Sequence, residues 1–204
     1  MNNQEIFFTY LENNFSERSE ELKTKFEQYY DVLVEANAKI NLFSRKMPLE
    51  EIWTTHFYDS LLPHKLIDKK KKRILDFGTG GGLPGIPMAI IFPEMQVNLL
   101  DGTKKKIMVI DEMIEILELA NVNTLWTRIE EYNTINKYDY IISRSVKIIP
   151  QFKQPLMNIL APKGKVILYK SKILDDVVQF DNYKIHNFSN EILGTRNIVE
   201  INYE

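Results

Sequence analysis

The stretch that most constrains the fold of this chain runs from Arg73 to Asp101. An apolar segment, Arg73–Phe77, leads into the glycine-rich turn Gly78–Gly82, a helical segment over Pro84–Phe92 and a second apolar segment that ends at Asp101. Glycine permits positive φ and lets backbone amides approach a ligand closely. A strand, a glycine turn, a helix and an acid about twenty residues further on are typical of sites that hold an adenosine-containing cofactor. We predict such a site here, with Asp101 accepting hydrogen bonds from ribose; a ligand-free turn is the alternative.

Composition indicates an ordinary globular chain. Of 204 residues, 44% are hydrophobic and 26% charged, which suits one full domain with an appendage. The absence of cysteine excludes disulfides and thiolate metal sites, and no other metal-binding spacing appears. The segment MNNQEIFFTYLENNF has no basic region before an apolar core, and no apolar run is long enough to cross a bilayer. We therefore expect a cytoplasmic protein without a membrane segment or a metal.

Residues 1–62 are expected to form a helical cap, and residues 63–204 the cofactor domain. In the cap, apolar residues recur at helical spacing, and the stretch before Pro63 contains no glycine and a single proline, Pro48. We predict helices over Glu5–Asn13, over Ser16–Ala38 with Ser16 as N-cap, and over Leu49–Leu61 with Pro48 in its first turn.

The cofactor domain alternates apolar strands with helical segments. Further elements are expected as follows: helix Lys104–Ala120 capped by Thr103, strand Asn123–Trp126, strand Tyr138–Ser143, helix Gln151–Leu160, strand Lys165–Tyr169 entered by the turn 162–164, a short helix near Asp175–Phe180, and strands Tyr183–Phe188 and Asn197–Asn202. The last two strands are too close in sequence for a helical crossover, so they must pair antiparallel. A dehydrogenase fold would use a sixth parallel strand. We therefore predict an α/β fold of the Rossmann-like, class I methyltransferase type, with seven strands, mostly parallel, and an antiparallel last strand.

Cations follow several of these strands. The carboxyl ends of parallel strands open on one edge of the sheet, which brings the loops after them together. Arg128, Arg144 and Lys170 lie in such loops, and Arg196 begins the last strand, which runs back from that edge. These four are candidates for positioning a phosphate-bearing substrate, because Arg in particular binds phosphate through two bonds. The alternative is that each is a solvated loop residue.

Two further features carry weaker signals. The run KKKKR at 69–73 precedes the first strand, so it is expected at the opposite, N-terminal edge of the sheet as a solvated stretch. His56 and Asp59 are three residues apart and share a helical face. They could bind a phosphate or orient each other, and a solvated local pair is the plainer interpretation.

Five ordered blocks resemble a known family. The blocks INLFSRKMPLEEIWTTHFYDSL, LDFGTGGGLPGIPMAI, LLDGTKKKIMVI, TRIEEY and IISRSV are similar to the small-subunit (16S) ribosomal RNA guanine-N7 methyltransferases. The resemblance implies S-adenosylmethionine as cofactor and N7 of one guanine in the 530 loop of 16S rRNA as target.

The same resemblance assigns cofactor contacts to individual residues. They are Gly78 and Leu83 in the glycine turn, Ile129 and Glu130 after the third strand, and Arg144 after the fourth; to these we add Gly80 from the turn and Asp101 from the ribose argument. Two departures stand out. The fifth strand ends Lys170-Ser171 where the family has Lys-Gly, and Ser143-Arg144-Ser145 replaces Ser-Arg-Ala.

The implied chemistry needs no general base, since guanine N7 has a lone pair and no proton to lose. We expect the enzyme to align the reactants, to act as a monomer, and to meet its rRNA in the assembled or assembling 30S subunit, because a chain of net charge −2 has little general attraction for naked RNA. The alternatives are an S-adenosylmethionine-dependent methyltransferase of another substrate and a non-catalytic ribosome-assembly factor.

Overall fold

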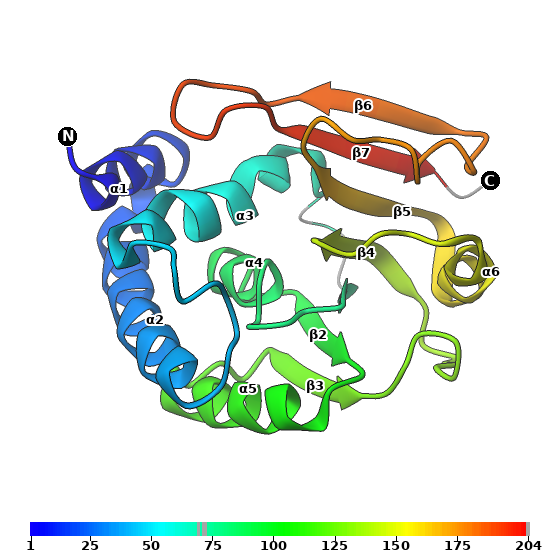
Figure 1. Cartoon of the computed structure of the whole chain (residues 1–204), viewed down its shortest axis with the longest axis horizontal. Helices are drawn as coiled ribbons and strands as arrows, with labels where there is room; N and C mark the ends of the chain where they lie inside the picture. Colours follow the sequence, from blue (N-terminus) through cyan, green and yellow to red (C-terminus); the bar gives the residue numbers. More distant parts are fainter. Residues whose placement is uncertain (69, 71–72, 203–204) are drawn as a thin grey trace.

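The computed structural model describes residues 1–68, 70 and 73–202, and its centre is one twisted sheet (Figure 1). Within those residues the sheet has seven strands in the order β3-β2-β1-β4-β5-β7-β6. They are β1 (Arg73–Phe77), β2 (Gln96–Asp101), β3 (Val122–Trp126), β4 (Tyr138–Arg144), β5 (Leu160–Lys170), β6 (Tyr183–Asn187) and β7 (Asn197–Asn202). Strands β1 to β5 pair parallel, and β7 pairs antiparallel with both β5 and β6. The predicted fold class is confirmed.

Three helices connect the parallel strands. They are α4 (Gly85–Ile91), α5 (Lys104–Ile116) and α6 (Pro150–Ile159). Helix α5 buries Ile107, Ile110 and Met113 as its spacing predicts, but Thr103 at its N-cap makes no side-chain capping bond. The expected helix near Asp175–Phe180 is wrong, because this segment forms turns. The expected turn 162–164 is part of the longer β5, at an irregularity of its pairing with β4.

The first two predicted helices of the N-terminal part are present, with one correction at the start of the second. Helices α1 (Asn3–Asn14) and α2 (Ser19–Lys39) are joined by the 3₁₀ turn η1 (Ser16–Arg18), so Ser16 lies in that turn and does not cap α2. The start of α1 is fixed by Asn2, whose side chain accepts from the amide of Glu5 while Glu5 accepts from the amide of Asn2.

The third predicted cap helix is not a regular α-helix. It is built of η2 (Leu49–Glu51), the π-helical η3 (Ile52–Tyr58), α3 (Asp59–Leu61) and η4 (Leu62–Leu66), and Pro48 precedes the first of these as its N-cap. The guanidinium of Arg144 donates to the carbonyls of Thr55 and His56 at 3.2 and 3.5 Å. A side chain that competes for helical carbonyls is a recognised cause of such irregularity.

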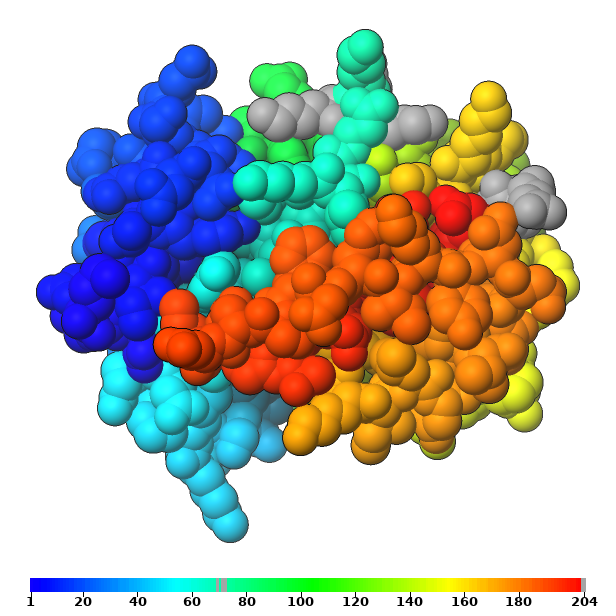
Figure 2. Space-filling view, turned by 90° about the horizontal axis from the view of Figure 1, so that it is seen from above, coloured from blue at the N-terminus to red at the C-terminus, as the bar shows by residue number. Residues whose placement is uncertain are grey.

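The core is divided by the sheet. On one face α4 and α5 pack against the strands, and the N-terminal helices pack over them; α6 covers the other face (Figure 1). One apolar cluster includes Phe26 and Leu33 of α2 together with Ile86 of α4 and Val97 of β2. The N-terminal helices and the sheet domain thus share one apolar cluster, and the boundary at residue 62 stays a prediction. Seen from above, the β6–β7 hairpin lies beside the N-terminal helices (Figure 2).

Most of the lysine run KKKKR lies outside the described residues. No helix among the described residues is long and apolar enough to cross a membrane.

Candidate active site: a glycine cradle and an arginine pocket

The glycine turn after β1 forms what we call the glycine cradle, residues 76–85 with Asp101. Gly78, Gly80 and Gly82 have φ of +73°, +60° and +86°, which residues with a Cβ adopt only at a cost. A Cβ on Gly78 would meet Val146 at 2.4 Å, whereas one on Gly80 would meet nothing nearer than 3.9 Å. The turn is therefore tight behind Gly78 and open in front of Gly80, where a ligand can approach the backbone.

Asp101 closes the cradle from the end of β2. Its two carboxylate oxygens accept from the amide of Gly80 at 3.1 Å and from that of Thr103 at 2.8 Å, and the residue is 9% exposed. Each oxygen retains a second lone pair for a further donor. The structure thus brings the predicted ribose-binding acid against the predicted turn.

Asp76 braces the turn from inside, a role that the sequence reasoning missed. Its Oδ2 accepts from the hydroxyl of Thr79 at 2.7 Å and the amide of Gly85 at 2.8 Å, while Oδ1 is buried without a partner. Burial raises the pKa of Asp76 to about 6, against the lowering effect of those two bonds. An acid inside the apolar segment Arg73–Phe77 was the signal that could have revealed it.

The N-terminal helices support the cradle from behind. The hydroxyl of Tyr29 on α2 donates towards the carbonyls of Gly81 and Gly82 at 3.4 and 3.5 Å. Leu42 packs 3.0 Å from where a Cβ of Gly81 would lie, and its amide is held by the side chain of Asn37 at 2.8 Å. Tyr29 and Leu42 were not predicted as site residues, since nothing in their local sequence indicates this contact.

The predicted contacts after β3 are divided between core and surface. Ile129 is 1% exposed and belongs to the same apolar cluster as Phe77 and Leu100, beside the carboxyl ends of β1 and β2. Glu130 and Arg128 are exposed, and Arg128 lies against Gly102. Leu83 is buried at the end of the turn.

A cavity of about 730 Å³ opens at the ends of β4, β5 and β7, between the sheet and the irregular cap helix. We call it the arginine pocket; among its lining residues are His56, Asp59, Arg144, Tyr169, Lys170 and Arg196. Three of the four predicted substrate-positioning cations are thus brought together, and Arg128 is not among them.

Asp59 holds the two arginines of this pocket. One oxygen accepts from Nη1 of Arg144 at 3.1 Å, and the other accepts from Nε of Arg196 at 2.7 Å. Asp59 is only 5% exposed, so the interpretation of a solvated pair with His56 is wrong. Its partners lie 85 and 137 residues away in the chain, which helical spacing could not reveal.

His56 lines the same pocket in its neutral form. Burial, followed by the positive charge of Arg144, lowers the pKa of His56 to about 4. Its Nδ1 lies 3.5 Å from Nη2 of Arg144, its ring meets Phe43 edge to face, and its Nε2 is buried without a partner. His56 is therefore a neutral polar side chain beside Arg144.

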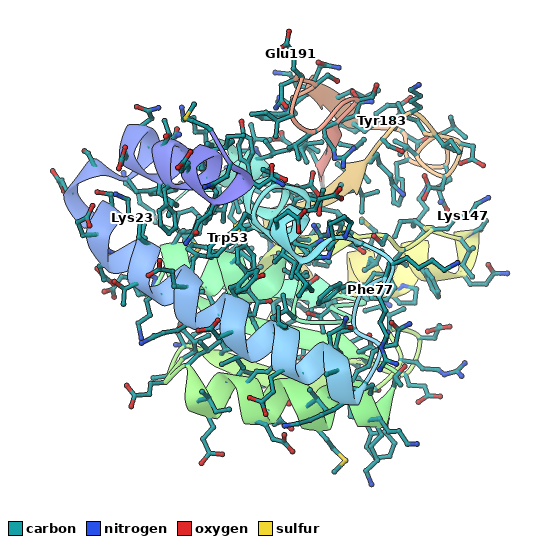
Figure 3. The ribbon with its side chains drawn as sticks, turned by 60° about the vertical axis from the view of Figure 1, so that its left-hand side comes forward. Lys23, Trp53, Phe77, Lys147, Tyr183 and Glu191 are labelled. Carbon is teal, nitrogen blue, oxygen red and sulfur yellow. The ribbon has the colours of Figure 1, made fainter. Side chains whose placement is uncertain are left out.

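The remaining pocket cations are also paired, which changes the predicted cationic rim. Lys170 forms an ion pair with Asp176, and Lys147 forms one with Asp175 at 3.2 Å. Lys147 extends from the loop after β4 at the surface (Figure 3). Both acids, Asp175 and Asp176, lie in the loop after β5, where we expected a short helix. The pocket is consequently far less positive than four free cations would make it.

The cradle and the pocket meet at the end of β4. The hydroxyl of Ser143 donates to the carbonyl of Phe77 at 2.8 Å, and Val146 packs behind Gly78. Arg144, predicted for both cofactor and substrate, points into the pocket from the strand between the two halves. Ser145, where the resembled family has Ala, lies in the pocket wall with φ of +63°.

A seven-stranded sheet with an inserted antiparallel last strand, a glycine cradle and an acid at the end of β2 define a Rossmann-like methyltransferase. The family model for rRNA small subunit methyltransferase G matches residues 22–195. Ribosomal RNA small subunit methyltransferase G of Oenococcus oeni is 35% identical over 83% of this chain and 72% of its own. That of Bacteroides thetaiotaomicron is 32% identical over 91% and 95%. The chain belongs to the rRNA small subunit methyltransferase G family.

Solved structures agree on the fold. A putative O-methyltransferase from Klebsiella pneumoniae superposes with a TM-score of 0.60 at 16% identity, covering 86% of this chain and 90% of its own. The predicted family and enzyme class are therefore confirmed, and S-adenosylmethionine is the cofactor of that class, as predicted. The assignments of individual site residues stay predictions. Among the described residues there is no cluster of three or more His, Asp or Glu side chains able to hold a metal.

Proposed function

We propose that the chain transfers the methyl group of S-adenosylmethionine to N7 of a guanine in the 530 loop of 16S rRNA, within the assembled or assembling small subunit. The observation that carries this proposal is the junction of the glycine cradle and the arginine pocket at Phe77, Ser143 and Val146. A cofactor in the cradle and a base in the pocket would meet over the end of β4.

Three features of the glycine cradle suit S-adenosylmethionine. The space before Gly80 admits the amino-acid part, Asp101 has lone pairs free for ribose hydroxyls, and the buried Oδ1 of Asp76 lacks a donor. Gly78, Leu83, Ile129 and Glu130 complete the predicted contacts. When bound, S-adenosylmethionine supplies a methyl group on a good leaving group.

The pocket's task is then to hold a purine. Guanine N7 needs no deprotonation, and its ring becomes positive as it is methylated. A neutral His56 and arginines already paired with Asp59 suit this charge better than free cations would. Within this proposal Arg144, Arg196 and Lys170 orient the substrate. Tyr169, whose hydroxyl donates to the carbonyl of Ser60 at 2.6 Å, forms part of the pocket wall.

The test is methyl transfer from labelled S-adenosylmethionine to purified 30S subunits, to protein-free 16S rRNA and to a protein extract, followed by mapping of the modified base. We expect label on N7 of one guanine of the 530 loop, with the 30S subunit as the better acceptor. Label on another base or only on protein would reject the proposal. No transfer by a protein that binds the cofactor would favour the assembly-factor alternative.

Two variants separate the halves of the site. Asp101→Ala should raise the Kd for S-adenosylmethionine in a calorimetric titration, with turnover recovered at high cofactor concentration. Arg144→Ala should lower methyl transfer, and wild-type turnover in this variant would contradict its assignment. Within this proposal the enzyme works as a monomer in the cytoplasm, where its ribosomal substrate is found; sedimentation of the free protein tests the first part.

A further inference from the structure

Two groups of cations at the carboxyl edge of the sheet differ in their partners. In the arginine pocket, Arg144, Arg196, Lys170 and Lys147 all form ion pairs. At the ends of β2 and β3, Lys104 and Arg128 are exposed, and neither forms an ion pair with another described residue. Phosphates of an approaching RNA would therefore find uncompensated charge beside β3 and not inside the pocket.

Trp126 is in contact with one of these two cations, Lys104. It ends the edge strand β3 and is 57% exposed, although the other tryptophan, Trp53, is 6% exposed inside the aromatic core of the cap (Figure 3). The ammonium of Lys104 lies 4.8 Å from the centre of the Trp126 ring. An exposed tryptophan is uncommon in a soluble protein unless it contacts something.

The orientation of the indole is fixed by the loop that follows Asp101. Its Nε1 donates to the carbonyl of Gly102 at 3.3 Å, and Asp101 pairs with Trp126 in the parallel register of β2 and β3. The side chain of Arg128 lies against the same Gly102, 3.5 Å from where a Cβ would stand. Lys104, Trp126 and Arg128, here named the Trp126 patch, are all exposed and lie around Gly102, one residue beyond the predicted ribose-binding acid.

We propose that the Trp126 patch binds single-stranded RNA adjoining the target guanine, with one base stacked on the indole and phosphates on Lys104 and Arg128. The proposal rests on the proposed function for the identity of the RNA, but the surface itself is separate from the arginine pocket. Stacking on an aromatic ring together with cations along the backbone is how proteins hold single strands without reading their sequence. The patch would position the strand, while the pocket receives the base to be methylated.

The experiment uses three variants of the full chain. Trp126→Ala removes the stacking surface, Trp126→Phe keeps an aromatic face but loses the bond to Gly102, and Tyr183→Ala is the matched control. Tyr183 is also an exposed aromatic residue on an edge strand, 39% exposed on β6 at the opposite edge of the sheet (Figure 3). For each, we would measure the unfolding midpoint, the Kd for S-adenosylmethionine, the KM for 30S subunits, and the Kd for a single-stranded oligoribonucleotide with the 530-loop sequence.

We expect Trp126→Ala to weaken oligoribonucleotide binding and raise the KM for 30S subunits about ten-fold. Trp126→Phe should lose no more than about three-fold, and Tyr183→Ala should match the wild type. The cofactor Kd should not change. Lys104→Gln should weaken RNA binding and reduce the salt dependence of log Kd by about one unit of slope. Acrylamide quenching of tryptophan fluorescence should report on Trp126, because Trp53 is buried, and the oligoribonucleotide should protect it.

Three outcomes would overturn the proposal. A raised cofactor Kd in Trp126→Ala with unchanged RNA binding would make Trp126 part of the cofactor site. Equal losses in Trp126→Ala and Tyr183→Ala would show a general surface effect, and wild-type RNA binding in Trp126→Ala would remove the patch's role. If the wild type fails to methylate 30S subunits, the proposed function fails, but protection of Trp126 by the oligoribonucleotide still decides whether the patch binds RNA.

Discussion

The glycine cradle and the arginine pocket are neighbours that are built in different ways. The cradle uses residues from one stretch of the chain, Asp76 to Asp101, and its shape depends on backbone conformation at Gly78, Gly80 and Gly82. The pocket gathers His56, Asp59, Arg144 and Arg196 from the cap, β4 and β7. The first is local and geometric, and the second is long-range and electrostatic. Substitutions in the cradle should therefore act through backbone conformation and packing, and substitutions in the pocket through the loss of charge pairing.

The two halves also treat buried charge differently. In the cradle the carboxylate of Asp76 is buried and accepts from a hydroxyl and an amide, and burial raises its pKa against the lowering effects of these two bonds and of Arg144. In the pocket Asp59 is buried between two guanidiniums. Hydrogen bonds from one hydroxyl and one amide hold Asp76, whereas the charges of two arginines converge on Asp59.

The largest effect is expected from Asp59→Ala. Removing this carboxylate leaves two largely buried arginines without their partner, which should cost about 3 kcal/mol of unfolding free energy, the lower end for a broken buried pair because Arg196 is partly exposed. Urea denaturation measures this. Methyl transfer should be lost, while the Kd for S-adenosylmethionine at a temperature where the variant is folded should change little. A cofactor Kd that rises with the loss of activity would show that the two halves are not separable. Asp59→Asn retains a hydrogen-bond acceptor, so its unfolding free energy should lie between those of Asp59→Ala and the wild type.

Gly85→Ala should be next. A Cβ here would lie 2.2 Å from Cδ2 of Leu99 and 2.7 Å from Oδ2 of Asp76, so α4 would have to move away from β1 and β2. We expect a loss of about 2 kcal/mol in urea denaturation, with weakened cofactor binding. Gly102→Ala is the control, because its Cβ would make only an ordinary contact at 3.5 Å with Arg128. Equal stability of the two variants would contradict the close packing of α4.

The third prediction concerns how the unfolding free energy depends on pH through His56 of the arginine pocket. Its pKa in the folded protein is about 4 and its ordinary value is 6.5, so the neutral form is favoured by folding. The stabilisation is present above pH 6.5 and is lost progressively as pH falls from 6.5 through 4. Between pH 7.5 and pH 5 the unfolding free energy of the wild type should fall by about 2 kcal/mol relative to that of His56→Gln.

Asp76 acts in the opposite sense over the same range. Its folded pKa is raised, so its contribution is fully present below pH 3.8 and is lost as pH rises through about 6. Both proteins contain Asp76, so the difference between wild type and His56→Gln cancels its contribution. A pH-independent difference would mean that His56 titrates normally and is not buried beside Arg144.

The smallest effect on stability is expected from Gly80→Ala. The added Cβ meets no close neighbour, and only the positive φ is unfavourable, at about 1 kcal/mol. Gly194→Ala is matched to it, because Gly194 also has a positive φ, +65°, and open space around it, but lies in the loop between β6 and β7. Both should lose similar stability, whereas only Gly80→Ala should raise the Kd for S-adenosylmethionine. If both leave the cofactor Kd unchanged, the open side of the cradle does not face the ligand.

The sequence supplied most of the fold because its signals are periodic and local. Alternating apolar segments and helical stripes located the strands and α5, and the short spacing before Asn197–Asn202 indicated the antiparallel strand. Errors fell where a distant partner overrides local preference. The cap helix is distorted at Thr55 and His56 by Arg144, and the segment after β5 is held as turns by Lys170 and by the amide of Ile148, both of which bond Asp176.

The candidate site divides along the same line. The sequence by itself determined the cradle, the position of Asp101 and the set of residues at the carboxyl edge, since strand order and glycine conformation follow from neighbours along the chain. Only the tertiary structure decided which cations form ion pairs. Arg144 and Arg196 pair with Asp59, and Lys170 pairs with Asp176. Lys104, which lies over the exposed Trp126, and Arg128 form no ion pair with another described residue. The reason is that a charge's effect depends on what lies within a few ångströms of it in space, and contacts across 85 or 137 residues leave no local trace in one sequence.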